Sequence, residues 1–521
     1  MIRTLGAWVC LATCVLALSG CSSDKNEPDD GPSLADPGDA VDPGPLAPCN
    51  YISNSKFQCG DLENFELSRC ARATLASGPT EGVYILQNRA GTSAGGGIIF
   101  PGAMKLSSDG TPSILAGGTA STESRQGQTF YLSREYPLSN GDTARYAYAG
   151  CESSSPQNLS GCFAICLNGL PRSYGSFEAT RALRSEGEQE AEGISRVSES
   201  FVQLGVPVDV YVTKGHAYVV SINMHTRTGG LTVFNVADPA KPVLVRTVTM
   251  PGDSYWNGVW SKGDALYVAS ASRGVLIFDI TDPANPAFVK AMPDSHIDVH
   301  TVFVEGDQLY AMSPSPSGET LIFDITSPLE PVLLTRFTAP GGDTRGYPHD
   351  AFAYEGRLYV NHWNLGYLIL DVRDPRNVRQ LGKYQYGNQT SHANAVGTIG
   401  GRTIAFEGGE NYDAHLRVLD VTEPSKPVKI GEFRLRPQSS IHNMVLAGTR
   451  LYIAWYQEGV RVLDVSNPAE PRPLAYFNTF RETDFERGYS FYDGAIGMRV
   501  PGDGYVYVVD TARGLLIFRE P

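Results

Sequence analysis

The 521-residue chain has no cysteine after Cys166 and no histidine before His216, so these two residue types occupy separate parts of the sequence. It lacks a glycine-rich phosphate loop ending in Lys-Ser or Lys-Thr. It also lacks a dinucleotide-binding glycine motif between a strand and a helix. Acidic residues outnumber basic ones by 56 to 42, and the basic residues form no stripe. These absences argue against nucleic acid as a partner and against nucleotide-dependent chemistry.

One sequence unit recurs along the C-terminal part of the chain. Its clearest copy, from Gly274 to Pro293, reads as an apolar strand, a turn built on Asp282-Pro283 and a second strand. A truncated copy, LLIFREP, ends the chain. Successive turn prolines lie 44 to 49 residues apart, at Pro239, Pro283, Pro328, Pro375, Pro424 and Pro468. Such a period, with short strands and no helical unit, predicts a β-propeller.

The number of blades follows from counting these copies. Six blades of four strands are complete, and a seventh, from about Tyr489 to Pro521, ends after its third strand. The segment SESFVQLGVP, beginning at Ser198, has the composition of an orphan outer strand. Pairing it with the last blade would close the ring and remove two exposed sheet edges. We therefore predict an all-β protein in which residues 197–521 form a seven-bladed β-propeller.

These segments resemble a known repeat. LIFDITDP from Leu276 and LRVLDVTEP from Leu416 resemble LVIVD repeats. Together with YPHDAF from Tyr347, they are similar to the choice-of-anchor B group of exported repeat proteins. The resemblance covers roughly residues 200–521. It implies the propeller fold and export, and it assigns no activity.

The N-terminus has the features of a lipoprotein signal. Residues 1–20 combine Arg3 with an apolar run and end in Leu-Ser-Gly before Cys21, which resembles the bacterial lipobox. The resemblance implies that Cys21 is lipidated, and Ser22 indicates transfer to the outer membrane. Residues 21–48 are rich in Asp, Pro and Gly, so we expect a tether that does not pack.

Residues 49–182 are predicted to form a small β domain. All its cysteines lie in one exported region, where an even number favours disulfides: Cys49, Cys59, Cys70, Cys151, Cys162 and Cys166. A zinc site is the less favoured alternative, because the region contains no histidine. Six cysteines allow 15 pairings, and the sequence does not choose among them. Residues 183–196 are charged and are predicted to be a linker.

The propeller contains all nine histidines, and eight map to loops on the face opposite the Asp-Pro turns. Residues that open inner strands are expected around the channel mouth, as a ligand or metal ring: His300, His349, Asp350, His392 and His442. The aromatic residues expected to contact a ligand on this face are Trp256, Trp363, Trp455 and Tyr456. Glu410 maps to the same face, but the sequence shows no carboxylate that clearly points inward. Neutral imidazoles suit zinc, copper, nickel or iron. A hydrated polar rim without any ligand remains an alternative.

Three functions are compatible with this arrangement. The first is a non-catalytic binding module of the cell envelope, held to the membrane by its lipid and binding a protein, peptide or glycan through the histidine and aromatic face. The second is a metal-dependent propeller hydrolase, similar to a lactonase, with the histidine ring as its centre. The third is a structural envelope protein that assembles through the Cys-rich domain. The sequence establishes no cofactor. A divalent metal ion is the one candidate, because the histidine ring could hold it.

Overall fold

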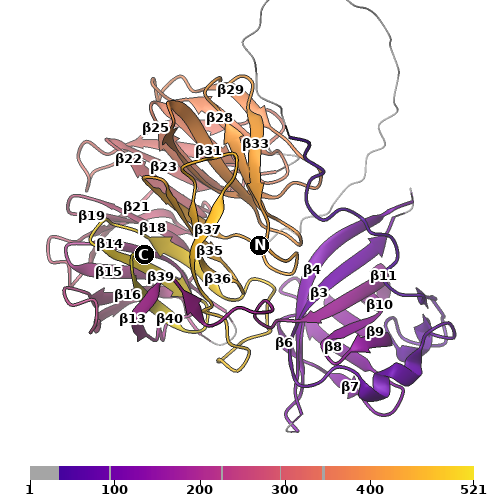
Figure 1. Ribbon diagram of the computed structural model, residues 1–521. Helices are drawn as coiled ribbons and strands as arrows, with labels where there is room; N and C mark the ends of the chain where they lie inside the picture. Colours follow the sequence, from indigo (N-terminus) through magenta and orange to yellow (C-terminus); the bar gives the residue numbers. More distant parts are fainter. Residues whose placement is uncertain (1–33, 93–94, 109, 225–226, 294, 343–345) are drawn as a thin grey trace, which may run out of the picture.

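Figure 1 shows the computed structural model, which describes residues 34–92, 95–108, 110–224, 227–293, 295–342 and 346–521. An N-terminal sheet domain, coloured indigo to violet, lies beside a ring of small sheets coloured from magenta to yellow. The predicted signal and Cys21 lie outside the described residues. None of the helices in the described part of the chain is long and apolar enough to cross a bilayer.

The N-terminal domain is a β half-barrel with the strand order β6-β5-β4-β3-β11-β10-β9-β8-β7. Its strands are β3 (Gly82–Gly91), β4 (Gly97–Leu106), β5 (Ile114–Leu115), β6 (Gly118–Thr119), β7 (Thr122–Ser124), β8 (Tyr131–Pro137), β9 (Thr143–Ser155), β10 (Asn158–Leu167) and β11 (Leu170–Arg181). Large aromatic side chains fill its core, among them Tyr84, Tyr148 and Phe163. Side chains alternate across a strand, so these rings share the inner face of the sheet.

Three disulfides fasten the segment before this sheet onto β9 and β10. The segment contains β1 (Asn50–Tyr51), η1 (Leu62–Asn64), β2 (Phe65–Glu66) and η2 (Arg72–Ser77). The pairs are Cys49–Cys162, Cys59–Cys166 and Cys70–Cys151. The predicted disulfides are thus confirmed, and the structure supplies the pairing. Cross-links over 81 to 113 residues restrict the unfolded chain strongly, and they are consistent with a protein outside the cytoplasm.

Seven sheets form the propeller in the described residues; six have four strands, and the sheet of blade six has a fifth. Blade one comprises β14 (Val206–Thr213), β15 (His216–Ile222), β16 (Gly230–Asn235) and β17 (Val243–Val248). Blade two comprises β18 (Trp256–Lys262), β19 (Ala265–Ser270), β20 (Gly274–Asp279) and β21 (Ala287–Met292). Blade three comprises β22 (Thr301–Glu305), β23 (Gln308–Ser313), β24 (Glu319–Asp324) and β25 (Val332–Thr338). Blades four and five comprise β26 (Asp350–Tyr354), β27 (Arg357–Asn361), β28 (Tyr367–Asp371), β29 (Arg379–Tyr384); β30 (Ser391–Ile399), β31 (Arg402–Gly409), β32 (Leu416–Asp420) and β33 (Val428–Phe433). Blades six and seven comprise β34 (Asn443–Ala447), β35 (Arg450–Trp455), β36 (Gly459–Asp464), β37 (Arg472–Phe477); β38 (Ala495–Arg499), β39 (Tyr505–Asp510) and β40 (Gly514–Arg519).

The repeated apolar strand is the third strand of each blade. In blade two, β19 and β20 are buried almost throughout, whereas β21 is largely exposed, because blades stack face to face and leave only their outer strands in solvent. The Asp-Pro turn follows the third strand. Asp279 accepts a hydrogen bond from the backbone N–H of Thr281, at 2.8 Å, and Asp282 accepts one from Ala284, at 3.2 Å. Such bonds hold a turn, which accounts for the repeated aspartates without any ligand.

One strand from the N-terminal side of the propeller closes the ring. β13 (Ser195–Ser200) pairs with β40 and supplies the fourth strand of blade seven. Arg513 of that blade forms an ion pair with Glu199 at 2.6 Å. The predicted closure by a strand near residue 198 is therefore confirmed, although the strand begins at Ser195. The seven-bladed all-β fold is confirmed with it.

The predicted linker packs against blade six. β12 (Ala191–Glu192) adds a strand to β37, and Glu188 pairs with Arg461 at 2.7 Å. The half-barrel also contacts the long loop between β37 and β38. A small apolar cluster joins the two, and Arg181 pairs with Glu482 at 2.5 Å. The two domains are therefore held together by several independent contacts.

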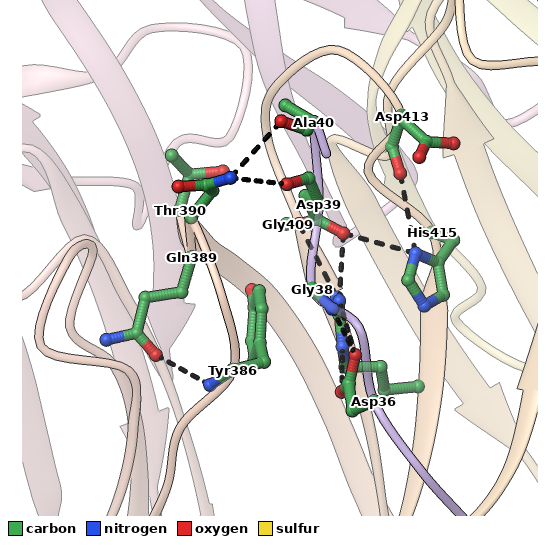
Figure 2. Close-up of polar contacts among 12 residues, drawn as sticks. Asp36, Gly38, Asp39, Ala40, Tyr386, Gln389, Thr390, Gly409, Asp413 and His415 are labelled. Atoms are coloured by element: carbon green, nitrogen blue, oxygen red, sulfur yellow. Dashed lines mark hydrogen bonds and ion pairs between the residues drawn. The ribbon is translucent and has the colours of Figure 1, made fainter. Parts of the chain in front are cut away.

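The described part of the predicted tether is also packed. Residues 34–48, called the strap from here on, run across blade five to the half-barrel. Figure 2 shows Asp36 and Asp39 of the strap among side chains of this blade. Both carboxylates contact the guanidinium of Arg417, Asp36 at 2.7 Å and Asp39 at 2.8 Å, and His415 lies 3.1 Å from Asp39. The expectation that residues 21–48 do not pack is wrong for residues 34–48.

Complementary charge explains why this acidic segment is ordered. Arg417 lies over the ring of Tyr386 at 3.4 Å, and its side chain is fully buried. Burial opposes ionisation of Asp36, but the hydrogen bond and charge of Arg417 outweigh it and hold the pKa of Asp36 well below its usual range. Gly38 has a φ of +86°, and a Cβ there would meet the carbonyl oxygen of Gly387 at 2.1 Å. The strap therefore fits blade five in one close arrangement.

Replacing Arg417 by alanine should destabilise the protein strongly. The substitution leaves Asp39 and Glu407 buried without their cation, which costs about 3–5 kcal/mol. Arg402→Ala is the control. It removes an exposed ion pair of the same blade, with Asp420, and should change the free energy of unfolding by less than about 1 kcal/mol. Chemical denaturation of the three proteins measures the difference, and equal losses for both variants would contradict the account of the strap.

Candidate functional site

The propeller brings together the four histidines that open inner strands of successive blades. The ring centroids of His300 and His349 lie 4.2 Å apart, those of His349 and His392 lie 4.0 Å apart, and those of His392 and His442 lie 4.6 Å apart. The four imidazoles therefore form an arc, called the histidine arc below, along blades three to six. The repeat places them there because each occupies the position just before or at the start of its inner strand.

The hydrogen bonds of the histidine arc differ from one member to the next. Nε2 of His300 lies 3.1 Å from the amide nitrogen of Asn257, and Nδ1 of His442 lies 2.8 Å from the carbonyl oxygen of Ile496. In contrast, Nδ1 of His349 and both ring nitrogens of His392 are buried and form no well-aligned hydrogen bond with the described residues. Unpaired buried polar atoms are costly, so these three nitrogens are the unusual feature of the arc.

The two central rings of the arc are buried and the two outer rings are partly exposed, so the alternative of a hydrated rim does not describe His349 and His392. His349 is 6% exposed and His392 is 2% exposed. Burial lowers the pKa of His300 to about 4 and that of His442 to about 3. Burial, reinforced by the neighbouring imidazoles, lowers the pKa of His349 and of His392 well below the usual value. At neutral pH all four rings are therefore uncharged, the form in which imidazole binds metal ions.

Two carboxyl groups lie next to the arc. Asp350 lines the channel beside His349, and burial raises its pKa to about 7. Glu410 lies on the other side, with Oε2 at 3.5 Å from Nε2 of His392, and the hydroxyl of Tyr456 donates to its Oε1. Burial raises the pKa of Glu410 to about 8. The sequence placed Glu410 on this face but did not show that it points inward.

The four aromatic residues predicted for the face separate into two groups. Trp363 stacks on the ring of His349 at 5.2 Å and on that of Tyr347 at 5.5 Å, and Tyr456 lies 5.3 Å from His442. These two belong to the surroundings of the arc. Trp256 and Trp455 are fully buried in hydrophobic clusters between blades, so their assignment to a ligand face is wrong. Each lies at the end of a strand whose neighbouring blade covers it.

A cavity of about 260 Å³ occupies the central channel below the arc. His349, His392 and His442 line one end of it. The inner strands run from this end toward the face of the Asp-Pro turns, where the lining includes the partly exposed Leu446 and the exposed Pro501. The cavity therefore leads to the histidine arc from the face of the Asp-Pro turns, whereas the sequence predicted a ligand on the opposite face.

A second arc, of larger aromatic rings, lines the cavity beyond the histidines. The rings of Tyr211 and Trp260 lie 5.3 Å apart, those of Trp260 and Phe303 4.5 Å, and those of Phe303 and Phe352 4.9 Å. We call these four residues the aromatic arc. The guanidinium of Arg499 lies 4.5 Å from the Trp260 ring. This arc was not predicted from the sequence, although three of its members follow Asn257, His300 and His349 by three residues.

The structure thus defines a class of protein: a disulfide-linked β half-barrel joined to a seven-bladed propeller with an amphipathic central cavity. The chain carries LVIVD repeats, which match residues 254–292 and 442–479. A propeller built on such repeats fits a non-catalytic interaction module. The resemblance to the choice-of-anchor B group stays a prediction.

Comparisons with other proteins add little beyond the fold. No curated protein matches this chain. Among solved structures, the WD40 β-propeller domain of Doa1 is 12% identical with a TM-score of 0.45, over 63% of this chain and 98% of that one. The computationally designed Ika8 protein is 8% identical with a TM-score of 0.41, over 62% of this chain and 100% of that one. Likenesses this distant carry no argument about function.

The buried imidazoles should make the protein acid-sensitive in the presence of a chelator. In the unfolded chain, His300 and His442 become protonated below about pH 6.5. In the folded protein their pKa values are about 4 and about 3, so they stay neutral to lower pH. The contribution of these two rings to stability is therefore complete above pH 6.5 and falls with decreasing pH, by up to about 1.4 kcal/mol per pH unit for each ring, whereas the buried carboxyl groups of Asp350 and Glu410 contribute with the opposite sign. Urea denaturation between pH 7.5 and 4.5 measures this slope. His300→Gln should reduce it, and the exposed His296→Gln should not; equal slopes for wild type and His300→Gln would refute the explanation.

Proposed function

We propose that this protein is a non-catalytic binding protein of the bacterial cell envelope that takes its ligand into the central cavity of the propeller. The observation that carries the proposal is the cavity itself, which joins an aromatic arc to a polar end within one partly open space. Binding sites for small molecules have this composition: apolar walls with a few polar groups that fix orientation. The LVIVD propeller supports the non-catalytic part of the proposal.

The lining suits a flat group with a polar end. Tyr211 and Trp260 offer aromatic rings, and Arg499 lies against both. The Arg499 guanidinium pairs with Asp209 at 3.3 Å and also donates to the carbonyl oxygens of Met498 and Val259, so it adds a polar group whose charge is already compensated. A volume of about 260 Å³ suits one ring system better than a chain of sugars or residues. A protein, peptide or glycan would therefore insert a single terminal group.

The fluorescent dye 1-anilinonaphthalene-8-sulfonate tests this site, because it combines flat rings with an anion. The folded protein should bind one dye molecule, and Phe352→Leu should weaken binding by about tenfold, since it removes one ring of the arc. Phe288→Ala is the matched control, because Phe288 is an exposed ring on the outer strand of blade two. Fluorescence titration gives both affinities. Equal binding by the Phe352 and Phe288 variants would refute the cavity as the site.

The envelope part of the proposal rests on Cys21 and on the disulfides. The lipobox-like sequence before Cys21 predicts a lipid anchor, and stable anchoring needs more than one acyl chain, which a lipidated N-terminal cysteine supplies. The outer membrane is the expected location. The three disulfides agree with an oxidising compartment.

Cys21→Ala should convert the protein from a membrane-associated to a freely soluble form. Partitioning between aqueous and detergent phases, after expression in a Gram-negative host, measures the change. Cys10→Ala is the control, because Cys10 lies inside the predicted signal and should leave partitioning unchanged. Retention of the Cys21 variant in the detergent phase would contradict the anchor. The metal-dependent hydrolase that the sequence suggested as the alternative would require a bound metal ion.

A further inference from the structure

A cluster of buried polar groups lies at the histidine end of the cavity, around His392, and this inference adds to the proposed function of the cavity. The His392 side chain is 2% exposed, and neither of its ring nitrogens forms a well-aligned hydrogen bond with the described residues, although Oε2 of Glu410 lies 3.5 Å from Nε2. Nδ1 of His349 is also buried without such a hydrogen bond. A neutral imidazole always has one N–H donor and one acceptor nitrogen, so at least one lone pair of His392 is available for a ligand.

Three ligand atoms converge at this place. One nitrogen of His349, one nitrogen of His392 and one carboxylate oxygen of Glu410 lie within 4.8 Å of one another. Nε2 of His392 and Oε2 of Glu410 are 3.5 Å apart. Two ligands of one tetrahedral ion, each bound at about 2.1 Å, stand about 3.4 Å apart. The distance between the imidazole nitrogen of His392 and the carboxylate oxygen of Glu410 therefore already matches the distance between two ligands of such an ion.

Neighbouring groups orient these ligands. The Tyr456 hydroxyl donates to Oε1 of Glu410, which leaves Oε2 directed at His392. Trp363 stacks on the His349 ring at 5.2 Å and limits its rotation. Hydrogen-bonded and packed neighbours of this kind are typical around metal ligands, because they fix the direction of each lone pair.

We propose that His349, His392 and Glu410 bind one divalent first-row transition-metal ion. Two imidazoles and one carboxylate favour such ions over Ca²⁺, which requires six or more oxygen ligands. His300 is outside the ligand set, because Asn257 already occupies its Nε2. Three protein ligands leave at least one position open. Because His349 and His392 also line the cavity, that position is available to a donor atom of a bound ligand.

Zinc loading of the full chain tests the proposal. The purified protein is stripped with a chelator, incubated with excess ZnCl₂, dialysed and analysed by elemental mass spectrometry. We expect one zinc ion per chain. A wild-type protein that retains no zinc overturns the proposal. This result is separate from the proposed function, because binding of the dye to the aromatic arc needs no metal.

Matched variants locate the ion. Glu410→Gln keeps the acceptor for Tyr456 and loses the carboxylate charge, so it and His392→Gln should weaken zinc binding more than about 100-fold. His300→Gln is the control, since it changes another imidazole of the same arc outside the ligand set, and it should retain the wild-type affinity. Tyr456→Phe should weaken binding about 10- to 100-fold. Isothermal titration calorimetry gives these affinities. Wild-type affinity in Glu410→Gln and His392→Gln overturns the assignment.

Cobalt substitution keeps the test informative where a variant fails to fold. Co²⁺ bound to wild-type protein at a four-coordinate nitrogen and oxygen site should produce visible ligand-field absorption, and ZnCl₂ should abolish it by competition. A spectrum identical to that of aqueous Co²⁺ overturns the proposal without any substitution.

Discussion

The pairing of β13 with β40 is the contact on which the rest of the molecule depends. It joins residues near 195 to the last strand of the chain and so completes a ring that sequential hairpins alone would leave open. The inner strands β14 and β38 then lie side by side, which encloses the central cavity. The same pairing restricts the segment just before β13. In that segment β12 pairs with β37 of blade six, and the half-barrel lies against the loop between β37 and β38.

Repetition made the fold predictable from sequence. A proline-containing turn follows the third strand of blades one to six, its hydrogen bonds are local, and its period counts these blades directly. Repetition also made the histidine arc predictable, because equivalent positions of successive blades are neighbours around the channel. The aromatic arc also occupies equivalent positions of the repeat, three residues after the histidine positions. Phe303 and Phe352 have the composition of ordinary strand residues, so the sequence alone did not show that they face the channel.

The incorrect assignments concern side-chain direction and burial. Asn257 faces the channel, and neighbouring residues of a strand point to opposite sides, so Trp256 has to enter the core between blades. Trp455 is buried in the same way. Burial of the imidazoles depends on loops from several blades and could not be read from any one repeat. The order of the strap has a different cause, since its composition is that of a disordered segment. It becomes ordered because Arg417 and Lys429 lie buried on blade five and need anions.

The strap fixes where the N-terminal segment leaves the propeller. Its first contact is at Leu34, whose backbone N–H donates to the carbonyl oxygen of Lys429 on blade five, at 3.1 Å. If Cys21 carries the proposed lipid, the thirteen residue steps from Cys21 to Leu34 would allow at most about 45 Å between the bilayer and blade five. The anchor would then hold the propeller at one edge of its ring, and a partner in the same membrane would meet the propeller at a raised effective concentration.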